Sequence, residues 1–506
     1  MSDQESRYTG LTSFLASLLS VGTGLVYSVM VTRRLALTEY GVWQYYSVII
    51  TLLSLPSSII GFWLTRELGR GNSVVHTGLS VSGLLSTLAS VILVAVSFFQ
   101  DPTLHVGLEV LLALALCLIL TYLSNSLDAT VSGVAPRLFG PGRLVLEVVK
   151  VSAGVVLVVL LRMGLLGAVL SIDIAFALKC LYVYLAVPRN KVGTVEISKG
   201  LLWLKRWWVP SIAAAPVLVS SMDLLVLTWL ADSTVPTAYL ALSKTVSAIV
   251  GFSGLMAISL YPQLLGGGTR RNIEESIRLV FIFALPMTAG IVALALPIVH
   301  LFGSNYAPAA TALQLLSLSA FFAVLRDLSV TIILGTEQVD NKSDVSAADL
   351  ARSGLVVPHA IEIVGYLLYI AIVTAAVSLI GMKGLSLEHL TTVTALVNVL
   401  VTIPMSLLVW RLSKRSCQYR TPWGDIAKYA TATVAMLAVV LALYPSQAIS
   451  VSISDVTSGL LPVVAVGGAV YFVVLFCIDR RVREDAEEIY RHFFGQRGKS
   501  LGLSEA

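Results

Sequence analysis

Six ionisable residues lie deep inside long apolar stretches of this sequence: Asp173, Asp223, Lys244, Arg326, Asp327 and Glu362. An ionised side chain at the centre of a membrane helix costs about 2.5–3.5 kcal/mol on insertion scales, so each one needs a partner or a task. A carboxylate in such a place can bind a proton or a metal cation, and a cationic side chain can bind an anion. The chemistry that these residue types offer is therefore the reversible binding of ions.

These six residues fall into two layers when depth is counted from the outer end of each stretch. Asp173, Asp223 and Lys244 lie about nine residues in, which is about 13 Å at the helical rise, and the other three lie about nineteen residues in. One interpretation is structural: each layer holds both signs, and Asp223 can pair with Lys244 because their stretches are consecutive and antiparallel. In the other interpretation, Asp223, Glu362 or Asp173 binds a coupling cation or proton, while Lys244 and Arg326 bind an anionic substrate.

Two further cations, Arg33 and Arg34, stand at an outer boundary, where Lys and Arg are normally rare. Either both reach the phospholipid headgroups, or at least one turns inward and holds a phosphate through the bidentate guanidinium fork. Four inner arginines could form a vestibule for the same anion, although the general retention of cations on the inner side also explains them: Arg66, Arg70, Arg137 and Arg143.

No pattern of a metal or nucleotide site accompanies these charges. His359 and Glu362 are three residues apart on one helix face, but a metal ion needs more ligands than these two. The sequence has no GxxxxGK[ST] run, so ATP hydrolysis is not expected. The 4 cysteines form no CxxC pair and are expected to be free thiols. We therefore expect a protein without metal or cofactor that is not an enzyme.

Long apolar stretches must position the charged residues, and these stretches dominate the chain. Of its 506 residues 57% are hydrophobic and 12% are charged, with a mean hydropathy of +0.87, whereas a soluble domain averages about 25% charged residues. A membrane helix needs about 20 mostly apolar residues, and the alternation of β-barrel strands is absent. We predict an all-α membrane protein with fourteen transmembrane helices, at 10–32, 42–64, 74–98, 106–127, 144–161, 165–187, 207–231, 235–265, 277–301, 307–334, 355–380, 385–410, 423–444 and 457–478.

The distribution of Lys and Arg sets the expected orientation, because these residues are retained on the cytoplasmic side. With the N-terminus inside, the outer segments hold only Arg33, Arg34, Arg162 and Lys383 of the 34 basic residues. Both termini are therefore expected in the cytoplasm, with the protein in the cell membrane. Residues 1–10 lack the basic start of a signal peptide, so the first stretch is expected to remain as a span.

A weak internal repeat predicts how the spans are grouped. Residues 31–49 resemble residues 230–248 at a shift of 199, which places Tyr40 on Tyr239. Gly164 and Gly167 likewise correspond to Gly381 and Gly384. Parallel repeats of this kind occur in transporters, with the substrate path between the halves.

We therefore predict two six-helix lobes in a pseudo-twofold arrangement, followed by two further helices and a tail. Their predicted bounds are 1–190, 200–412, 420–478 and 479–506. The tail could form a short amphipathic helix on the inner leaflet or a solvated anchor.

The run from Thr32 to Gly41 resembles the polysaccharide-export flippases of the multidrug/oligosaccharidyl-lipid/polysaccharide superfamily. Members of that family typically carry Arg-x-Leu-Gly-x-x-Glu-Tyr-Gly between their first two spans, and this sequence has Ala36 in place of the first Gly. Gly164, Gly167 and Ala168 also look like the family. The resemblance covers all fourteen spans in number and orientation, although its local motifs are short.

This resemblance implies transport of lipid-linked saccharides, carried on polyprenyl phosphate or diphosphate, from the inner to the outer leaflet. It implies alternating access of two lobes without ATP hydrolysis, and it puts the segment of Arg33 and Arg34 beside a central cavity. Its expected partners are the lipid-linked substrate, membrane lipids, and a glycosyltransferase or polymerase of the same pathway; nucleic acid is not among them.

Two alternatives share the fold that this resemblance implies. One is a lipid II flippase, which has a cationic central cavity and a sodium site between its seventh, eleventh and twelfth spans. Asp223 and Glu362 lie on two of these spans, but about ten residues apart in depth, so they are not expected to share one ion. The other is a cation-coupled multidrug antiporter, which usually has twelve spans.

Overall fold

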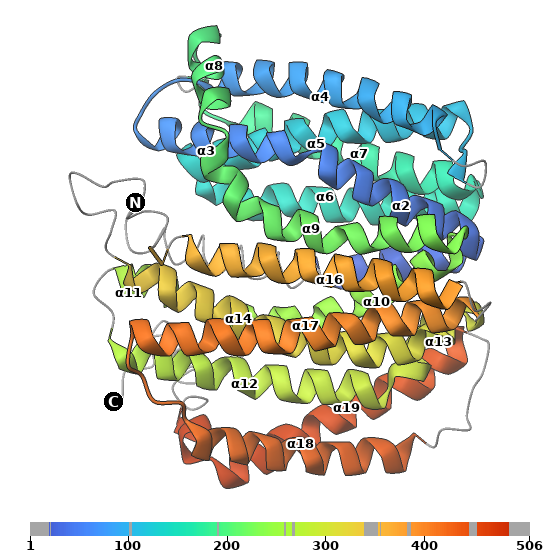
Figure 1. Cartoon of the computed structure of the whole chain (residues 1–506), viewed down its shortest axis with the longest axis vertical. Helices are drawn as coiled ribbons and strands as arrows, with labels where there is room; N and C mark the ends of the chain where they lie inside the picture. Colours follow the sequence, from blue (N-terminus) through green and yellow to red (C-terminus); the bar gives the residue numbers. More distant parts are fainter. Residues whose placement is uncertain are drawn as a thin grey trace, which may run out of the picture. The chain divides into compact units, whose positions relative to one another are not determined.

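The computed structural model describes residues 20, 22–100, 104–189, 192–257, 260–265, 269–337, 353–354, 356–381, 386–444 and 453–484. Within these residues the chain forms helices joined by turns, without a strand (Figure 1). The predicted all-α class is confirmed. Most of the predicted inner loop after residue 334, and the predicted tail beyond Glu484, lie outside the described residues.

The described helices are long and apolar enough to cross a membrane many times. Eleven of them pass a test of length and hydropathy, and a bent pair makes up to twelve. A shorter apolar helix, Gly22–Thr32, lies within the first predicted span. Each predicted span contains a described helix or part of one, so the multi-pass membrane class is confirmed, while the number fourteen stays a prediction.

The second predicted span, 42–64, consists of two helices with a bend between them. Helix α2 (Leu37–Leu53) and helix α3 (Leu55–Gly69) meet at Ser54 with an angle of 45°. Pro56 lies in the first turn of α3 and has no N–H to donate to the preceding turn, which interrupts the helical hydrogen bonding at this point.

Two other predicted spans change their helical type along their length. The fifth begins as α6 (Phe139–Gly154) and continues as a π-helical segment, η3 (Val155–Leu160). The eighth begins as α10 (Val235–Ser247), continues as a 3₁₀ segment, η5 (Ala248–Ala257), and is followed by α11 (Leu260–Leu265). Such changes of helical pitch were not visible in the hydropathy pattern, because hydropathy reports how apolar a segment is and not which helical hydrogen bonds it forms.

The chain divides into two compact units that are not continuous in sequence. Unit 1 comprises the described residues of Met1–Val246, Phe302–Ala312 and Val356–Val401, and unit 2 those of Ser247–Leu301, Leu313–Leu355 and Thr402–Ala506. These units do not test the predicted lobes 1–190 and 200–412, which stay a prediction.

The remaining helices can be assigned to these units by their bounds. Unit 1 also holds α4 (Val75–Phe98), α5 (Leu108–Val134), η2 (Pro136–Leu138), α7 (Gly164–Ala186), α8 (Ile197–Lys205), α9 (Trp208–Ala231), η6 (Ser304–Tyr306) and α16 (Val357–Gly381). Unit 2 holds α12 (Arg270–Ala293), α18 (Trp423–Leu443) and α19 (Ile453–Ile478). Unit boundaries fall inside α10, α13 (Ala295–Phe302), α14 (Ala309–Thr336) and α17 (Leu387–Ser416).

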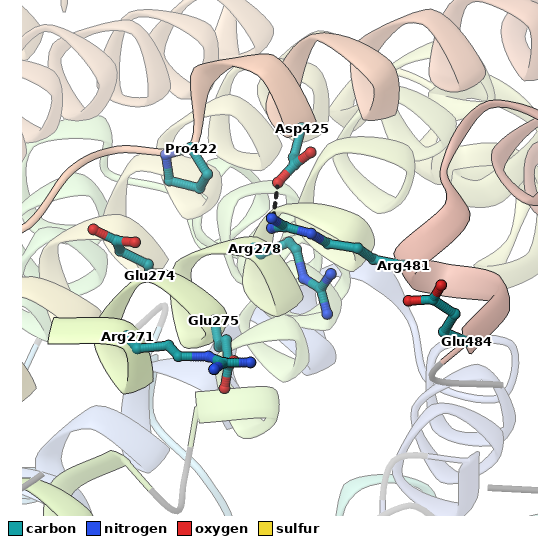
Figure 2. A pocket seen from close by; sticks show the side chains of 8 residues that line it. All are labelled: Arg271, Glu274, Glu275, Arg278, Pro422, Asp425, Arg481 and Glu484. Carbon is teal, nitrogen blue, oxygen red and sulfur yellow. Dashed lines mark hydrogen bonds and ion pairs between the residues drawn. The ribbon is translucent and has the colours of Figure 1, made fainter. Parts of the chain in front are cut away.

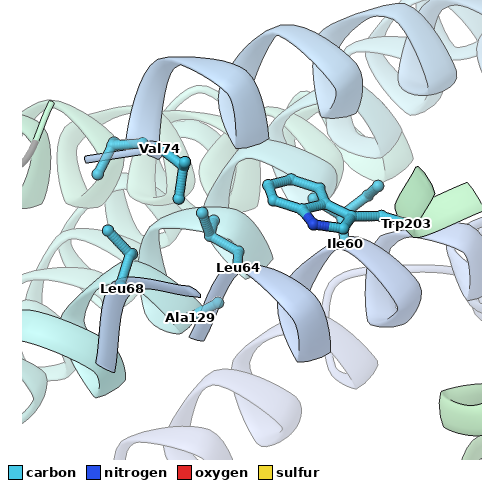
Figure 3. Close-up of a cluster of buried hydrophobic side chains, with 7 residues drawn as sticks. Ile60, Leu64, Leu68, Val74, Ala129 and Trp203 are labelled. Atoms are coloured by element: carbon cyan, nitrogen blue, oxygen red, sulfur yellow. The ribbon is translucent and has the colours of Figure 1, made fainter. Parts of the chain in front are cut away.

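Helix α8 is an element that the sequence did not predict. It contacts α3 and α4 and runs across their direction (Figure 1). Its Trp203 inserts into a buried cluster formed by Ile60, Leu64, Leu68, Val74, Val75 and Ala129 (Figure 3). The guanidinium of Arg206 lies 5.7 Å from the ring centre of Trp63, within cation–π distance. These contacts fix the connection between α7 and α9.

Candidate functional site

The best-defined polar cluster inside the apolar helices is centred on Asp223 of α9. This side chain is completely buried. Its Oδ1 accepts a hydrogen bond from Lys244 Nζ of α10 at 2.6 Å, and its Oδ2 accepts one from the Tyr369 hydroxyl of α16 at 2.7 Å. The Lys244 ammonium also donates to the Ser220 carbonyl oxygen at 3.3 Å. The predicted pair of Asp223 and Lys244 is therefore present.

Two residues of this cluster were missed by sequence reasoning because they carry no charge. Tyr369 projects from α16, which lies side by side with α9 (Figure 1). Its hydroxyl is also hydrogen-bonded by the side chain of Asn398, from α17. A signal was available: Tyr369 lies seven residues, or two helical turns, after Glu362 on the same helix face. Asn398 is the one amide in the apolar run 395–401.

The burial of the cluster is uneven, and this decides which group can meet a ligand. Asp223 has no exposed side-chain surface, whereas 29% of the Lys244 side chain is exposed. Lys244 lies nine residues after the start of α10, or about 13 Å along the helix. An ammonium in hydrocarbon is costly, so a lysine at this depth is expected to pair with a carboxylate or to meet a polar ligand. The cluster can thus present one cation while it hides its carboxylate.

Asp173 of α7 is placed differently from Asp223. It is 2% exposed, and no N–H or O–H group of the described residues donates to either carboxylate oxygen. The Cys117 thiol of α5 is a neighbouring polar group, and the Tyr27 hydroxyl nearby bonds to Ser171 instead, at 2.7 Å. An ionised carboxylate without a cation is expensive in a membrane, so this site favours a protonated carboxyl.

Glu362 and Arg326 are buried, but the structure does not place either with the Asp223 cluster. Glu362 receives a contact of 3.1 Å from His359 Nδ1, one turn earlier on α16. Its distance from Tyr369 along the helix is about 10 Å, in keeping with the expectation that Asp223 and Glu362 do not share an ion. Arg326 belongs to unit 2, where its guanidinium donates to the adjacent Asp327 at 2.9 Å.

Arg33 and Arg34 differ in their surroundings at the end of helix Gly22–Thr32. Arg33 is half-buried, and this burial lowers the pKa of its guanidinium, although Arg stays charged at physiological pH. Arg34 is exposed. Neighbouring residues of a turn point in different directions, which explains why only one of the two is covered.

The four predicted vestibule arginines are not assembled into one site by the described structure. Arg66 lies over the Phe62 ring at 4.3 Å, and Arg70 stands 3.7 Å from Glu67. Arg137 is exposed and Arg143 is half-buried. The vestibule therefore stays a prediction.

A second buried ion pair in unit 1 was also missed. Lys179 of α7 donates to Asp128 of α5 at 2.6 Å and to the Ser124 hydroxyl at 2.8 Å. The Lys179 side chain is only 8% exposed. The Lys179 ammonium is enclosed while 36% of the Asp128 side chain is exposed, and the pair links α5 to α7.

Unit 2 has a polar cavity of about 390 Å³ where α12, α18 and the end of α19 meet (Figure 2). It is lined by Arg271, Glu274, Glu275, Arg278, Pro422, Asp425, Arg481 and Glu484. Asp425 contacts Lys428 at 2.9 Å and Arg481 at 3.4 Å. Exposed ion pairs of this kind contribute about 0–1 kcal/mol each, so the cavity is a junction that attaches the start of the tail to α18.

The described residues include no group of three His, Cys, Asp or Glu side chains that could hold a metal ion. His359 and Glu362 remain the two-residue pair that the sequence indicated. What the structure does provide is a set of bent membrane helices with charged residues held between them, which is the architecture of a multi-pass membrane protein with polar sites inside the bilayer.

Comparison with solved structures places this architecture within a known fold. The chain is similar to the lipid II flippase MurJ in an inward closed conformation, with a TM-score of 0.62, 13% identity, and coverage of 95% of this chain and 99% of the flippase. It is also similar to an inward-facing multidrug resistance MATE transporter of the MOP superfamily, with a TM-score of 0.59, 13% identity, and coverage of 78% and 95%.

A third similar structure is a MOP superfamily transporter from Pyrococcus furiosus, with a TM-score of 0.53, 11% identity, and coverage of 80% and 95%. The sequence matches no protein-family model and no protein of curated function. The chain thus has the fold that these transporter structures share, which is the fold that the resemblance at Thr32–Gly41 implied.

Proposed function

We propose that this protein is a flippase that translocates a lipid-linked oligosaccharide, on a polyprenyl phosphate or diphosphate carrier, from the inner to the outer leaflet. It works by alternating access and hydrolyses no ATP. The observation that carries this proposal is the length of the fold match. The match to the lipid II flippase extends over 95% of this chain, whereas the match to the MATE transporter extends over 78%.

The charge chemistry of unit 1 supports an anionic cargo. The side chain of Lys244 is partly exposed while its carboxylate partner Asp223 is hidden, so the accessible charge of this pair is positive. Arg33 adds a half-buried guanidinium, which can hold a phosphate by two parallel hydrogen bonds. A drug antiporter that takes cations would need the reverse, an accessible carboxylate. Unit 1 has that arrangement in the pair of Lys179 and Asp128, which are 8% and 36% exposed, but Asp128 lies at the end of the predicted span 106–127 rather than within it.

The proposal also includes the location of the protein, its orientation in the membrane and its partners. The protein resides in the cell membrane with both termini in the cytoplasm, because its Lys and Arg residues concentrate in the predicted inner segments. Its partners are a glycosyltransferase that completes the saccharide on the inner leaflet and, after translocation, a polymerase or transferase that consumes it.

Reconstitution into proteoliposomes with defined cargos tests the function. Three probes are compared under an imposed membrane potential: a polyprenyl diphosphate disaccharide, lipid II, and a cationic dye. We expect the disaccharide lipid to become accessible to an external glycan-cleaving enzyme, with no ATP hydrolysis and no dye transport. Translocation of lipid II alone would identify the alternative cargo, and dye transport alone would identify an antiporter.

A further inference from the structure

The carboxylate of Asp223 already has a cation of its own. Both of its oxygens are engaged, Oδ1 by the Lys244 ammonium at 2.6 Å and Oδ2 by the Tyr369 hydroxyl at 2.7 Å. Hard metal cations require several free oxygen ligands. The sodium site implied by the resemblance would lie among α9, α16 and α17, and the groups that this chain places there, Asp223, Tyr369 and Asn398, do not fit such an ion.

A transporter of alternating access must change conformation both with and without cargo. An unpaired charge inside a span is costly in either state. In the empty state the pair of Lys244 and Asp223 is neutral as it stands. When an anionic cargo arrives, the partly exposed Lys244 is the accessible member of the pair, and Asp223 is buried beneath it. Phosphate and Asp223 then compete for the same ammonium.

We propose that Lys244 is a shared counter-ion: its ammonium neutralises Asp223 in the empty protein and moves to a phosphate of the cargo on binding, whereupon Asp223 takes up one proton. This inference rests on the proposed function, because it requires an anionic cargo. The step forms one O–H bond on Asp223, with the proton supplied by the surrounding water, and breaks no covalent bond. Lys244 keeps its proton, so the pair of Lys244 and Asp223 gains one positive charge, which offsets one negative charge of the bound phosphate.

The groups around Asp223 are compatible with this exchange. On α10 the facing charge is Lys244, and on α16 the facing titratable groups are Tyr369 and, next to it, Tyr366. Asn398 of α17 is neutral and holds Tyr369 in place. Helix α2 meets α9 further along, where Trp229 donates to the Tyr45 hydroxyl at 3.0 Å. Among the described residues that contact Asp223, Lys244 is the one cation, so its departure leaves protonation as the way to neutralise this carboxylate.

Calorimetric titration of the purified full-length protein with farnesyl diphosphate tests the exchange. Measurement in two buffers of different ionisation enthalpy gives the number of protons taken up per bound ligand. We expect about one proton in the wild type near neutral pH, since one carboxylate changes state. Asp223→Asn should bind the ligand without proton uptake. Lys244→Gln should bind at least about tenfold more weakly, because a charged hydrogen bond is lost.

Matched variants separate these effects from misfolding. Lys179→Gln removes a lysine with the same 2.6 Å ion pair but an enclosed side chain, and it should bind and take up protons as the wild type does. The double variant Asp223→Asn with Lys244→Gln leaves no buried charge unpaired; it should be folded but bind weakly. Sodium binding is tested by replacing choline chloride with sodium chloride. The melting temperature of the wild type should not change, because Asp223 is already paired with Lys244.

The outcomes distinguish this inference from the function on which it rests. Binding without proton uptake in the wild type, unweakened binding in Lys244→Gln, or stabilisation by sodium would overturn the exchange. If a lipid-linked saccharide is nevertheless translocated, the proposed function stands. If neither farnesyl diphosphate nor a lipid-linked saccharide binds, both proposals fall.

Discussion

The rings of Tyr40 and Tyr239, which are related by the internal repeat, pack edge-to-face against the same third ring, that of Tyr306. The centroid distances to Tyr306 are 5.9 and 6.3 Å. The helices that carry the two residues, α2 and α10, begin at Leu37 and Val235, one residue from the predicted shift of 199. The repeat therefore places two equivalent tyrosines at one aromatic junction of unit 1.

Gly41, beside Tyr40, is expected to be essential for the approach of the two repeats. A Cβ at this position would collide with the carbonyl oxygen of Thr234. Gly41→Ala should therefore lower the free energy of unfolding by about 1–3 kcal/mol, as overpacking does, measured as a fall in melting temperature. Gly83→Ala in α4 is the control, because nothing lies near its Cβ position. Equal melting temperatures for the two variants would contradict the contact.

Arg33 and Arg34 are expected to respond differently to replacement by Lys, which keeps the charge but loses the bidentate fork. Arg33 is half-buried and Arg34 is exposed, so Arg33→Lys should reduce flipping severely at normal expression while Arg34→Lys should not. Flipping of the lipid-linked probe in proteoliposomes measures both. Wild-type rates in both variants would reduce the two residues to interfacial anchors.

Asp223→Asn is expected to impair transport more than Asp425→Asn. The first change removes the fully buried carboxylate that neutralises Lys244. Asp425 instead contacts Lys428 and Arg481 at more exposed positions. We expect a loss of at least about tenfold for Asp223→Asn and a change within about twofold for Asp425→Asn. Initial rates at equal reconstituted protein provide the measurement. Unimpaired transport in both would leave the Asp223 pair a purely structural one.

Asp173→Asn is expected to preserve the fold, because an amide has nearly the shape of a protonated carboxyl. No N–H or O–H group of the described residues donates to Asp173, so the amide has no such hydrogen bond to lose. If Asp173 binds a coupling proton, the variant should melt near the wild-type temperature but lose the pH dependence of its transport rate. A pH profile that matches the wild type would show that this carboxyl plays no part in coupling.

The predicted orientation can be tested at two positions that lie outside the described residues. In a variant without the 4 native cysteines, a cysteine at Ser343 should resist a membrane-impermeant thiol reagent added to intact cells. A cysteine at Ser450 should react, because the retention of Lys and Arg on the cytoplasmic side places it outside. Reaction at Ser343 from outside would invert the topology.

Much of the fold could be predicted from the sequence because the bilayer imposes a simple rule. A backbone in hydrocarbon must satisfy its own hydrogen bonds, so long apolar stretches become helices. Hydropathy alone therefore located α4 and α7 to within one residue at each end, and the start of α5 to within two, although α5 continues seven residues beyond its predicted end. It could not locate the bend at Ser54, because a proline does not always end a membrane helix. Pro56 lies next to the bend, whereas Pro286 lies inside the continuous helix α12.

The candidate site, too, could be predicted from the sequence only in part. Sequence by itself identified Asp223 and Lys244 as a pair, because consecutive antiparallel spans bring residues of equal depth together and because a buried charge needs a partner. Only the tertiary structure added Tyr369 and Asn398. They come from α16 and α17, far along the chain, and they carry no charge that would single them out in an apolar span. It also decided that Asp223 is hidden while Lys244 is accessible, since exposure depends on which helices pack around a span, and hydropathy contains no record of those neighbours.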